Sequence, residues 1–214
     1  MLVLTLFVTA FMLGLLFNAA PGAVFAKTIS EGAKGGFKPA LAVQIGSLVG
    51  DALWAILGLL GIGLLLQLDV IRTPVAIAGI AYLLWLAWDN WQEAKTEFSV
   101  GEIDDNPLVK KALRDGMMLS LTNPQNIAYW AALGSAMGAV GVANPDVGDY
   151  GIFFAGFMVS SIVWCFFCAA LVDQVFKRLG FGWAKLTYQA CAVAFLYLAY
   201  ASAQDLWQQT ALVA

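Results

Sequence analysis

Phe17 to Trp54 reads FNAAPGAVFAKTISEGAKGGFKPALAVQIGSLVGDALW, with a Pro-Gly pair at the end of one apolar run and a single aspartate, Asp51, inside the next. Asp51 is the thirteenth residue of the run that begins at Pro39. If this run is a membrane helix rising about 1.5 Å per residue, Asp51 lies about 18 Å along it, near the bilayer centre. A carboxylate there costs about 2.5–3.5 kcal/mol and has to be paired, hydrated or protonated. The stretch therefore predicts a broken membrane helix followed by one that carries a buried acid.

The composition of the whole chain agrees with a membrane setting. Of 214 residues, 61% are hydrophobic and 12% are charged, there is no histidine, and the mean hydropathy is +0.80. Soluble domains average roughly 45–50% apolar and 25% charged residues. The sequence predicts an integral protein of the lipid bilayer. Nucleic acid is not an expected partner, because no basic patch is interleaved with aromatic residues.

Six apolar segments of about 18–28 residues are each long enough to cross a hydrocarbon core of about 30 Å. They run approximately over residues 2–26, 39–66, 73–91, 115–140, 150–176 and 186–207. We expect one all-α membrane domain over residues 1–214, with a first half at about 2–91, a cytoplasmic linker at 93–114 and a second half at about 115–207.

Lys and Arg residues gather in three of the expected loops. Residues 27–38, 92–114 and 177–185 hold ten of the eleven cationic residues, and Arg72 is the exception. The positive-inside rule places these loops in the cytoplasm and both termini outside.

The two halves resemble each other. GSLVGDALW at residues 46–54 lines up with GFMVSSIVW at 156–164, an offset of 110, and YLLWLAW at 82–88 lines up with AFLYLAY at 194–200, an offset of 112. Three helices are an odd number, so the second copy enters the membrane from the opposite side. Inverted repeats of this kind are common among secondary transporters, in which two halves rock around a site near the midplane.

Two separated motifs resemble those of the LysE/RhtB amino-acid exporters. The first, residues 18–62, has a Pro-Gly at the end of the first helix, spaced glycines and a Gly-x-x-x-Gly-Asp core; the second is LRDGMMLSLTNPQN at 113–126. Many members continue Pro-Gly with Pro and then Asn or Asp, whereas this chain has Ala23 and Val24. The resemblance implies a six-helix exporter in the bacterial inner (plasma) membrane, and it weakly suggests a homodimer. It leaves the substrate open among basic, neutral and sulfur-containing amino acids and related small metabolites.

The two prolines suggest where a substrate binds. Pro21-Gly22 and Asn123-Pro124 each predict a helix break, which is tolerated only where the freed backbone groups face protein or water. Half-helix N-termini are positive ends that suit a carboxylate. We therefore expect the breaks to hold the carboxylate of an amino acid while Asp51 faces its amine or carries the coupling proton. The candidate substrate-binding or coupling residues are Asn18, Pro21, Gly22, Gln44, Ser47, Asp51, Thr122, Asn123, Pro124 and Asn126.

Gln44, Ser47 and Asp51 are spaced by three and four residues, so they share one helix face. The repeat-related positions in the second half are Phe154, Phe157 and Ser161. The sequence therefore predicts an asymmetric site with its polar stripe in the first half. Two alternatives stay open: the prolines are kinks that only shape the bundle, and Asp51 is a structural aspartate bonded to a broken helix of the other half.

No catalytic or metal-binding constellation accompanies this stripe. The chain has no histidine and no paired carboxylates at ligand spacing within a span, and Cys165, Cys168 and Cys191 read as packing residues of apolar helices. We expect no enzyme activity and no cofactor. The favoured function is export driven by proton antiport, and the alternative is a membrane assembly or scaffold protein in which Asp51 is structural.

Overall fold

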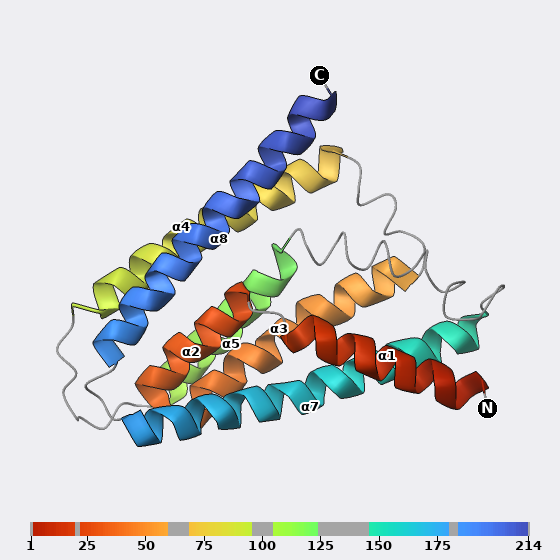
Figure 1. The fold of residues 1–214 in the computed structure, drawn as a ribbon, viewed down its shortest axis with the longest axis horizontal. Helices are drawn as coiled ribbons and strands as arrows, with labels where there is room; N and C mark the ends of the chain where they lie inside the picture. The colour runs from red at the N-terminus through yellow and green to blue at the C-terminus, as the bar shows by residue number, and fades with distance from the viewer. Residues whose placement is uncertain are drawn as a thin grey trace.

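The computed structural model describes residues 2–19, 22–59, 69–95, 105–123, 146–179 and 184–213, and these ranges contain α-helices and no strand (Figure 1). The all-α prediction is confirmed for this part of the chain. The helices are α1 (Leu2–Ala19), α2 (Ala23–Gly35), α3 (Phe37–Leu59), α4 (Asp69–Glu93), α5 (Asp105–Leu121), α7 (Val147–Leu179) and α8 (Ala184–Val213).

The first predicted span bends where the Pro-Gly pair lies. α1 ends at Ala19, and α2, with Gly22 as its N-cap, leaves at an angle of 64°. A proline lacks an N–H group and restricts the residue before it, which accounts for a break at this point. The second predicted break falls after α5, which ends at Leu121; residues 124–145 lie outside the described ranges.

Residues 27–38 are helical, so the prediction of a loop there was wrong. α2 runs to Gly35, and Gly36, at a φ of 71°, turns the chain directly into α3. Charge alone does not exclude a helix from the protein interior, because the cations of α2 find partners there. The other two predicted loops are also shorter: α5 already begins at Asp105, and α7 continues to Leu179.

Among the described residues, three helices are long and apolar enough to cross a bilayer, namely residues 37–58, 147–178 and 185–208. The bent pair of α1 and α2 makes a fourth if it is counted as one span. The predicted span 115–140 lies mostly outside the described residues. Six spans in an inverted repeat therefore stay a prediction.

The helices pair across the two predicted halves. α1 packs along α7, α3 packs along α5, and α4 packs along α8, while α2 lies among α3, α5, α7 and α8 (Figure 1). In the predicted halves, α1 and α5 come first and α3 and α7 come second. The first helix of each half thus packs on the second helix of the other.

Glycines allow close approach in both crossed pairs. A Cβ on Gly46 of α3 would collide with the carbonyl oxygen of Leu113 in α5, and one on Gly156 of α7 would lie 2.6 Å from the carbonyl oxygen of Phe7 in α1. Gly46 and Gly156 are also at matching positions of the repeat, 110 residues apart. Small residues at helix contacts let backbones approach closely in membranes. The two crossed pairs use the same device.

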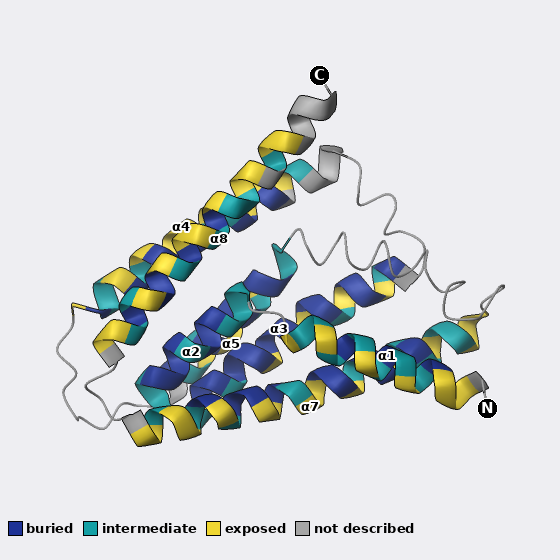
Figure 2. Ribbon diagram, in the orientation of Figure 1, coloured by how far each residue is buried: buried dark blue, intermediate teal, exposed yellow. Residues whose placement is uncertain are grey.

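The outer faces of the bundle are apolar. Large side chains on α4, α7 and α8 are exposed, among them Trp88, Phe167 and Leu196 (Figure 2). A surface of this kind is unusual in a water-soluble monomer, whereas a bilayer accommodates it. The pattern fits helices that face lipid.

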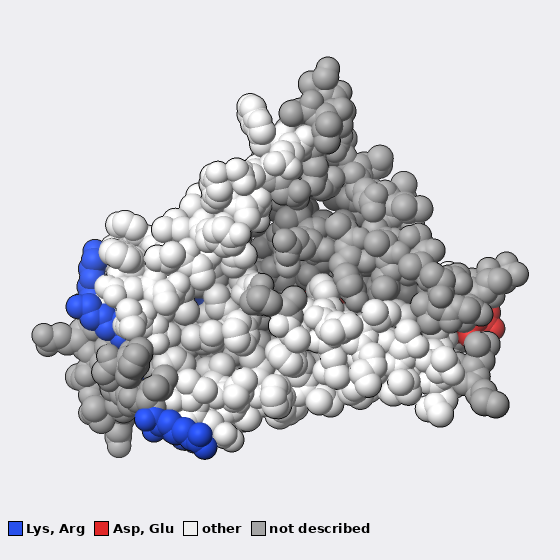
Figure 3. Space-filling view, in the orientation of Figure 1, with Lys and Arg blue, Asp and Glu red and all other residues white. Residues whose placement is uncertain are grey.

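Charged side chains show at two ends of the molecule in one view. On the face shown in Figure 3, Lys and Arg gather at the end where α7 finishes, and acidic side chains lie at the opposite end, where α7 begins. Both chain termini lie away from the cationic end (Figure 1). We call the end where α7 finishes, with Lys177 and Arg178 in its last turn, the cationic end.

Candidate functional site

A cavity of about 60 Å³ lies where the two predicted breaks meet. Gly22, Ala23 and Val24 at the start of α2 line one side, and Thr122 and Asn123 after α5 line another. The remaining described lining residues come mainly from α4 and α8 and are Gly79, Ile80, Leu83, Leu119, Leu198 and Ser202. The fold thus brings together two breaks that are about a hundred residues apart in the sequence.

The start of α2 gives this cavity a positive end. The first N–H groups of a helix have no partner within the helix, and Gly22 at the N-cap has no side chain to accept from them. The aligned peptide dipoles place about half a positive charge at such an end. Anions and carboxylates bind there readily. Chemically, this side of the cavity suits a carboxylate group.

Asp51 lies in the contact between α3 and α5. It is buried, and its Oδ1 accepts a hydrogen bond of 2.7 Å from the Ser120 hydroxyl. Trp54 Nε1 donates to the backbone oxygen of the same Ser120 at 3.1 Å. Asp51 is not among the described residues that line the cavity. Ser120 belongs to the other predicted half and lies one turn before the second predicted break.

The rest of the predicted polar stripe makes contacts within the bundle. Gln44 Nε2 donates to Thr28 Oγ1 of α2 at 2.8 Å and to Cys168 Sγ of α7 at 3.6 Å. Ser47 donates to the backbone oxygen of Gln44 at 2.8 Å. Both side chains are buried, Gln44 links α3 to α2 and α7, and neither residue is among the described lining of the cavity.

Asn18 connects the two halves near the end of α1. Its Nδ2 donates to Ser161 Oγ of α7 at 2.9 Å and to the backbone oxygen of Gly14 at 2.7 Å. Ser161 is the repeat counterpart of Asp51. The two hydrogen bonds, Asn18 to Ser161 and Ser120 to Asp51, therefore occupy matching crossed contacts.

The structure unites Gly22, Thr122 and Asn123 at one cavity, whereas Asn18, Gln44, Ser47 and Asp51 lie in the surrounding helix contacts. Pro21, Pro124 and Asn126, which complete the predicted set, lie outside the described residues. The roles of all ten stay predictions.

Lys27, Glu31 and Asp115 form a buried ion cluster that the sequence did not predict. Lys27 Nζ lies 2.7 Å from Glu31 Oε1 and 3.1 Å from Asp115 Oδ2, and the three side chains are at most 6% exposed. The Tyr82 hydroxyl of α4 donates to Asp115 Oδ1 at 3.0 Å. The cluster joins α2, α4 and α5. A buried charge of this kind persists only when it is paired and hydrogen-bonded.

A ring of partly exposed contacts surrounds the buried ion cluster toward the cationic end. Lys111 pairs with Asp89 at 2.9 Å, and Lys34 pairs with Glu93 at 2.7 Å. Arg114, which is largely exposed, reaches Asp115 Oδ1 at 3.6 Å. These contacts tie α2 and α5 to α4 on the side of the cavity that faces the cationic end.

One signal for the buried ion cluster was present in the sequence. Lys27 and Glu31 have the i, i+4 spacing of a helical ion pair. Their segment, AVFAKTISEGAKG, contains no proline, so a helix was available to it. The partner across the fold, Asp115, had no such signal, because its distance from Lys27 depends on how α2 and α5 pack.

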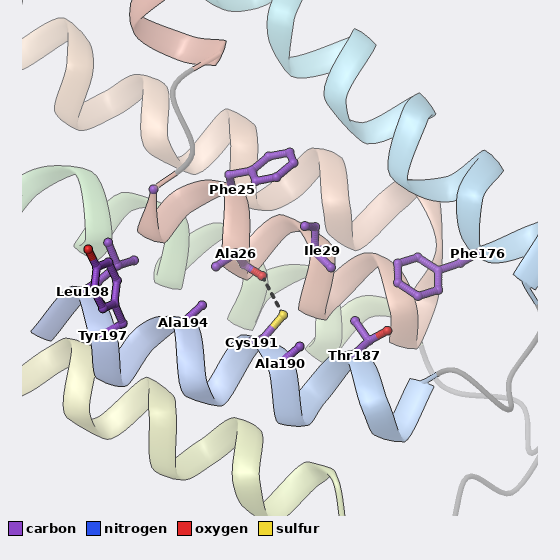
Figure 4. Close-up of a pocket in the computed structure, with 11 residues that line it drawn as sticks. Phe25, Ala26, Ile29, Phe176, Thr187, Ala190, Cys191, Ala194, Tyr197 and Leu198 are labelled. Carbon is purple, nitrogen blue, oxygen red and sulfur yellow. Dashed lines mark hydrogen bonds between the residues drawn. The ribbon is translucent and has the colours of Figure 1, made fainter.

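A larger apolar groove of about 530 Å³ lies beside the cavity, between α2 and α8. Figure 4 shows Phe25, Ile29 and Phe176 along one side of the groove. Cys191 Sγ donates a hydrogen bond of 3.4 Å to the backbone oxygen of Ala26. The described residues that line the groove carry no charge, and Gly22 lines both the groove and the cavity.

Comparison with known proteins gives a consistent picture. The sequence matches the family model of the LysE type translocators over residues 15–205. It is 44% identical over 196 residues to the chemotactic transduction protein ChpE of Pseudomonas aeruginosa. The aligned region covers 92% of this chain and 96% of that protein. It is 24% identical over 176 residues to the putative amino acid efflux protein YcgF of Bacillus subtilis, covering 82% and 84% of the two chains. Identity to the homoserine/homoserine lactone efflux protein of Salmonella typhi is 28% over 124 residues, or 55% and 57% of the two chains. No solved structure matches the chain significantly.

Proposed function

The chain belongs to the LysE type translocator family, and from this premise we propose that it exports amino acids or related small metabolites from the cytoplasm by proton antiport. Two relatives are named for efflux of amino acids or of homoserine and its lactone. The observation that carries the proposal is the cavity at the start of α2, where both predicted breaks meet. A helix N-terminus beside a small cavity, with the polar side chains of Thr122, Asn123 and Ser202 in its lining, suits the carboxylate that amino acids share.

The crossed helix contacts support a transporter with two related halves. α1 on α7 and α5 on α3 are equivalent pairings, and both have close glycine contacts and a polar bond between halves. Alternating access needs two rigid units that move around a common site. In our proposal the cavity between α2 and α5 is that site.

The proposed direction of transport follows from the cationic end. By the positive-inside rule this end lies in the cytoplasm, which places both termini outside. The buried ion cluster and the contacts around it lie between the cavity and this end. We propose that the arrangement described here is closed toward the cytoplasm, and that substrate enters when α2, α4 and α5 separate.

The substrate's side chain has a natural place in the apolar groove. Gly22 borders both spaces, so a ligand whose carboxylate lies at the start of α2 can extend between α2 and α8. Ligand pockets usually measure about 300–1,000 Å³, and the groove falls within this range. We therefore favour neutral amino acids with an apolar side chain over basic ones.

An export assay tests the proposal. Cells that overproduce the protein are loaded with radiolabelled basic, neutral and sulfur-containing amino acids, and release is followed with and without a protonophore. We expect faster release of at least one neutral amino acid than from cells with the empty vector, and loss of this difference with the protonophore. Equal release of every amino acid from both cell types would contradict the proposal.

A signalling function is the second candidate. The relative at 44% identity is named as a chemotactic transduction protein. The bond between Asp51 and Ser120 also fits the alternative in which Asp51 is structural. If the protein is a membrane signalling component without transport activity, normal cell behaviour should depend on it. The export assay should then show no release beyond that from cells with the empty vector.

A further inference from the structure

Lys27 forms ion pairs with two buried carboxylates, those of Glu31 and Asp115, beside the candidate cavity. We infer that Lys27 pairs with Asp115 while the site is empty, and that the ammonium group of a substrate replaces it there. The inference rests on the proposed export of amino acids and names Asp115 as the group that recognises the amine. Its ligand class is the α-amino acid with a free, protonated amine.

The ion pair lies one helical turn from the cavity wall. Ala23 and Val24, which line the cavity, precede Lys27 by four and three residues, and Leu119 follows Asp115 by four. Residues at these spacings share a helix face, and one turn rises about 5.4 Å. An amino acid whose carboxylate lies at the start of α2 would therefore place its ammonium group toward Asp115.

Lys27 can leave Asp115 without losing every partner. A buried ammonium stripped of its only counter-ion is strongly unfavourable. Glu31, however, already holds Lys27 at 2.7 Å, and its Oε2 accepts no hydrogen bond within the described part of the chain. Asp115 in turn keeps the hydroxyl of Tyr82 at 3.0 Å. Exchange of Lys27 for a ligand ammonium therefore leaves each of these groups paired.

The charges around the buried ion cluster leave room for a second cation. Lys111 is held by Asp89, which lies 3.9 Å from Lys27, and the side chain of Arg114 is 63% exposed, so water screens its charge. In the buried part, one ammonium is shared by two carboxylates. A ligand ammonium would give each carboxylate its own cation. The cavity of about 60 Å³ is far smaller than ordinary ligand pockets, so binding requires it to widen.

Binding to the purified full-length protein in lipid nanodiscs tests the inference. The probes are radiolabelled L-leucine, L-homoserine and L-lysine. The competitors are the corresponding hydroxy acids, in which a hydroxyl replaces the α-ammonium group of each probe. We expect Asp115→Asn to weaken binding by about tenfold or more, because a charge-assisted hydrogen bond is lost. Lys27→Gln should bind equally well or more tightly, because the resident competitor is gone. The hydroxy acids should not compete in the wild type.

Opposite effects of the two partners of one ion pair distinguish this role from a structural one. Loss of binding by more than about twofold in Lys27→Gln, or competition by the hydroxy acids, would overturn the inference. Should Lys27→Gln fail to fold, the Lys27→Gln/Glu31→Gln variant removes one charge of each sign and is read in the same way. If neither folds, competition by the hydroxy acids in the wild type decides.

The matched control is the ion pair of Lys177 and Asp173 within α7, at 2.6 Å, which lies outside the contacts among α2, α4 and α5. The Lys177→Gln/Asp173→Asn variant should bind the probes as the wild type does; weakening equal to that of Asp115→Asn would overturn the inference. If the wild type binds none of the three amino acids, the inference fails, and the export assay decides whether the proposed export stands. If it binds them but Asp115→Asn binds equally well, the proposed export stands and only the inference falls.

Discussion

At the scale of single residues, two buried aspartates have different surroundings. Asp51 accepts from the hydroxyl of Ser120, whereas Asp115 faces Lys27 and accepts from Tyr82. A carboxylate beside an ammonium group has its charge balanced by that group. In our proposals Asp51 carries the coupling proton and Asp115 recognises an amine.

Replacing Asp51 with Asn tests the coupling role. The amide is nearly isosteric, and its oxygen can still accept from Ser120, so the variant should fold. Because an amide does not titrate, we expect export driven by a proton gradient to fall to background. The measurement is release of labelled amino acid from proteoliposomes with an imposed pH gradient.

Ser120→Ala is the matched control, since it removes the same hydrogen bond and leaves the carboxylate in place. It should export at a rate close to that of the wild type, with stability lower by about 1 kcal/mol. An Asp51→Asn variant that exports at the wild-type rate would return Asp51 to the structural role.

At the scale of the helices, glycines set how closely α3 and α5 approach. A Cβ on Gly116 would collide with the backbone oxygen of Val43, which cannot move without the whole of α3. The backbone is a harder obstacle than a flexible side chain. The contact between these helices therefore depends on the absence of a single methyl group.

Gly116→Ala should destabilise the protein by about 1–3 kcal/mol, the usual cost of overpacking. Gly151→Ala in α7 is the control, because its Cβ would meet nothing within 4 Å and alanine is the better helix former. Thermal unfolding in detergent should show a lower midpoint for Gly116→Ala and an equal or higher one for Gly151→Ala. Equal midpoints for the two variants would contradict the described contact of α3 and α5.

The burial of α2 can be tested by chemical labelling. Thr28 is fully buried and bonded to Gln44, whereas Lys110 is exposed at the start of α5. In a variant whose three native cysteines are replaced, a membrane-impermeant thiol reagent added to inside-out vesicles should label Lys110→Cys. Thr28→Cys should stay unlabelled until the protein is denatured. Equal labelling would mean that residues 27–35 form an accessible loop.

At the scale of the whole molecule, the crossed pairing of the helices fits the predicted two halves, and the cations gather at one end. α1 with α7 and α5 with α3 repeat the same contact, and α4 with α8 joins the halves a third time. The cationic end defines the orientation that the proposed export requires.

Reporter fusions test this orientation. A reporter joined after Ala214 should be active only as an extracytoplasmic protein, and one inserted between residues 96 and 104 should be active only in the cytoplasm. Positive charges fix the orientation because cationic segments are retained on the cytoplasmic side. A cytoplasmic signal from the fusion after Ala214 would overturn the orientation and the proposed direction of transport.

The sequence by itself determined the membrane character, the all-α class, the bend at the Pro-Gly pair and the family. The first three depend on local properties, namely how apolar each segment is and where proline and glycine interrupt a helix, whereas the family follows from the resemblance of two motifs. For the candidate site, it named Gly22, Thr122 and Asn123, because both breaks carry a visible proline motif.

Only the tertiary structure decided that residues 27–35 are a buried half-helix and that Lys27 pairs with Asp115. The sequence read Lys27 as a loop cation, since a lysine between two apolar segments normally stays in water. Whether it can be buried depends on a carboxylate from another helix reaching it, because an isolated charge is not tolerated in the interior. That encounter is set by the packing of α2 against α5, which the sequence of neither helix contains.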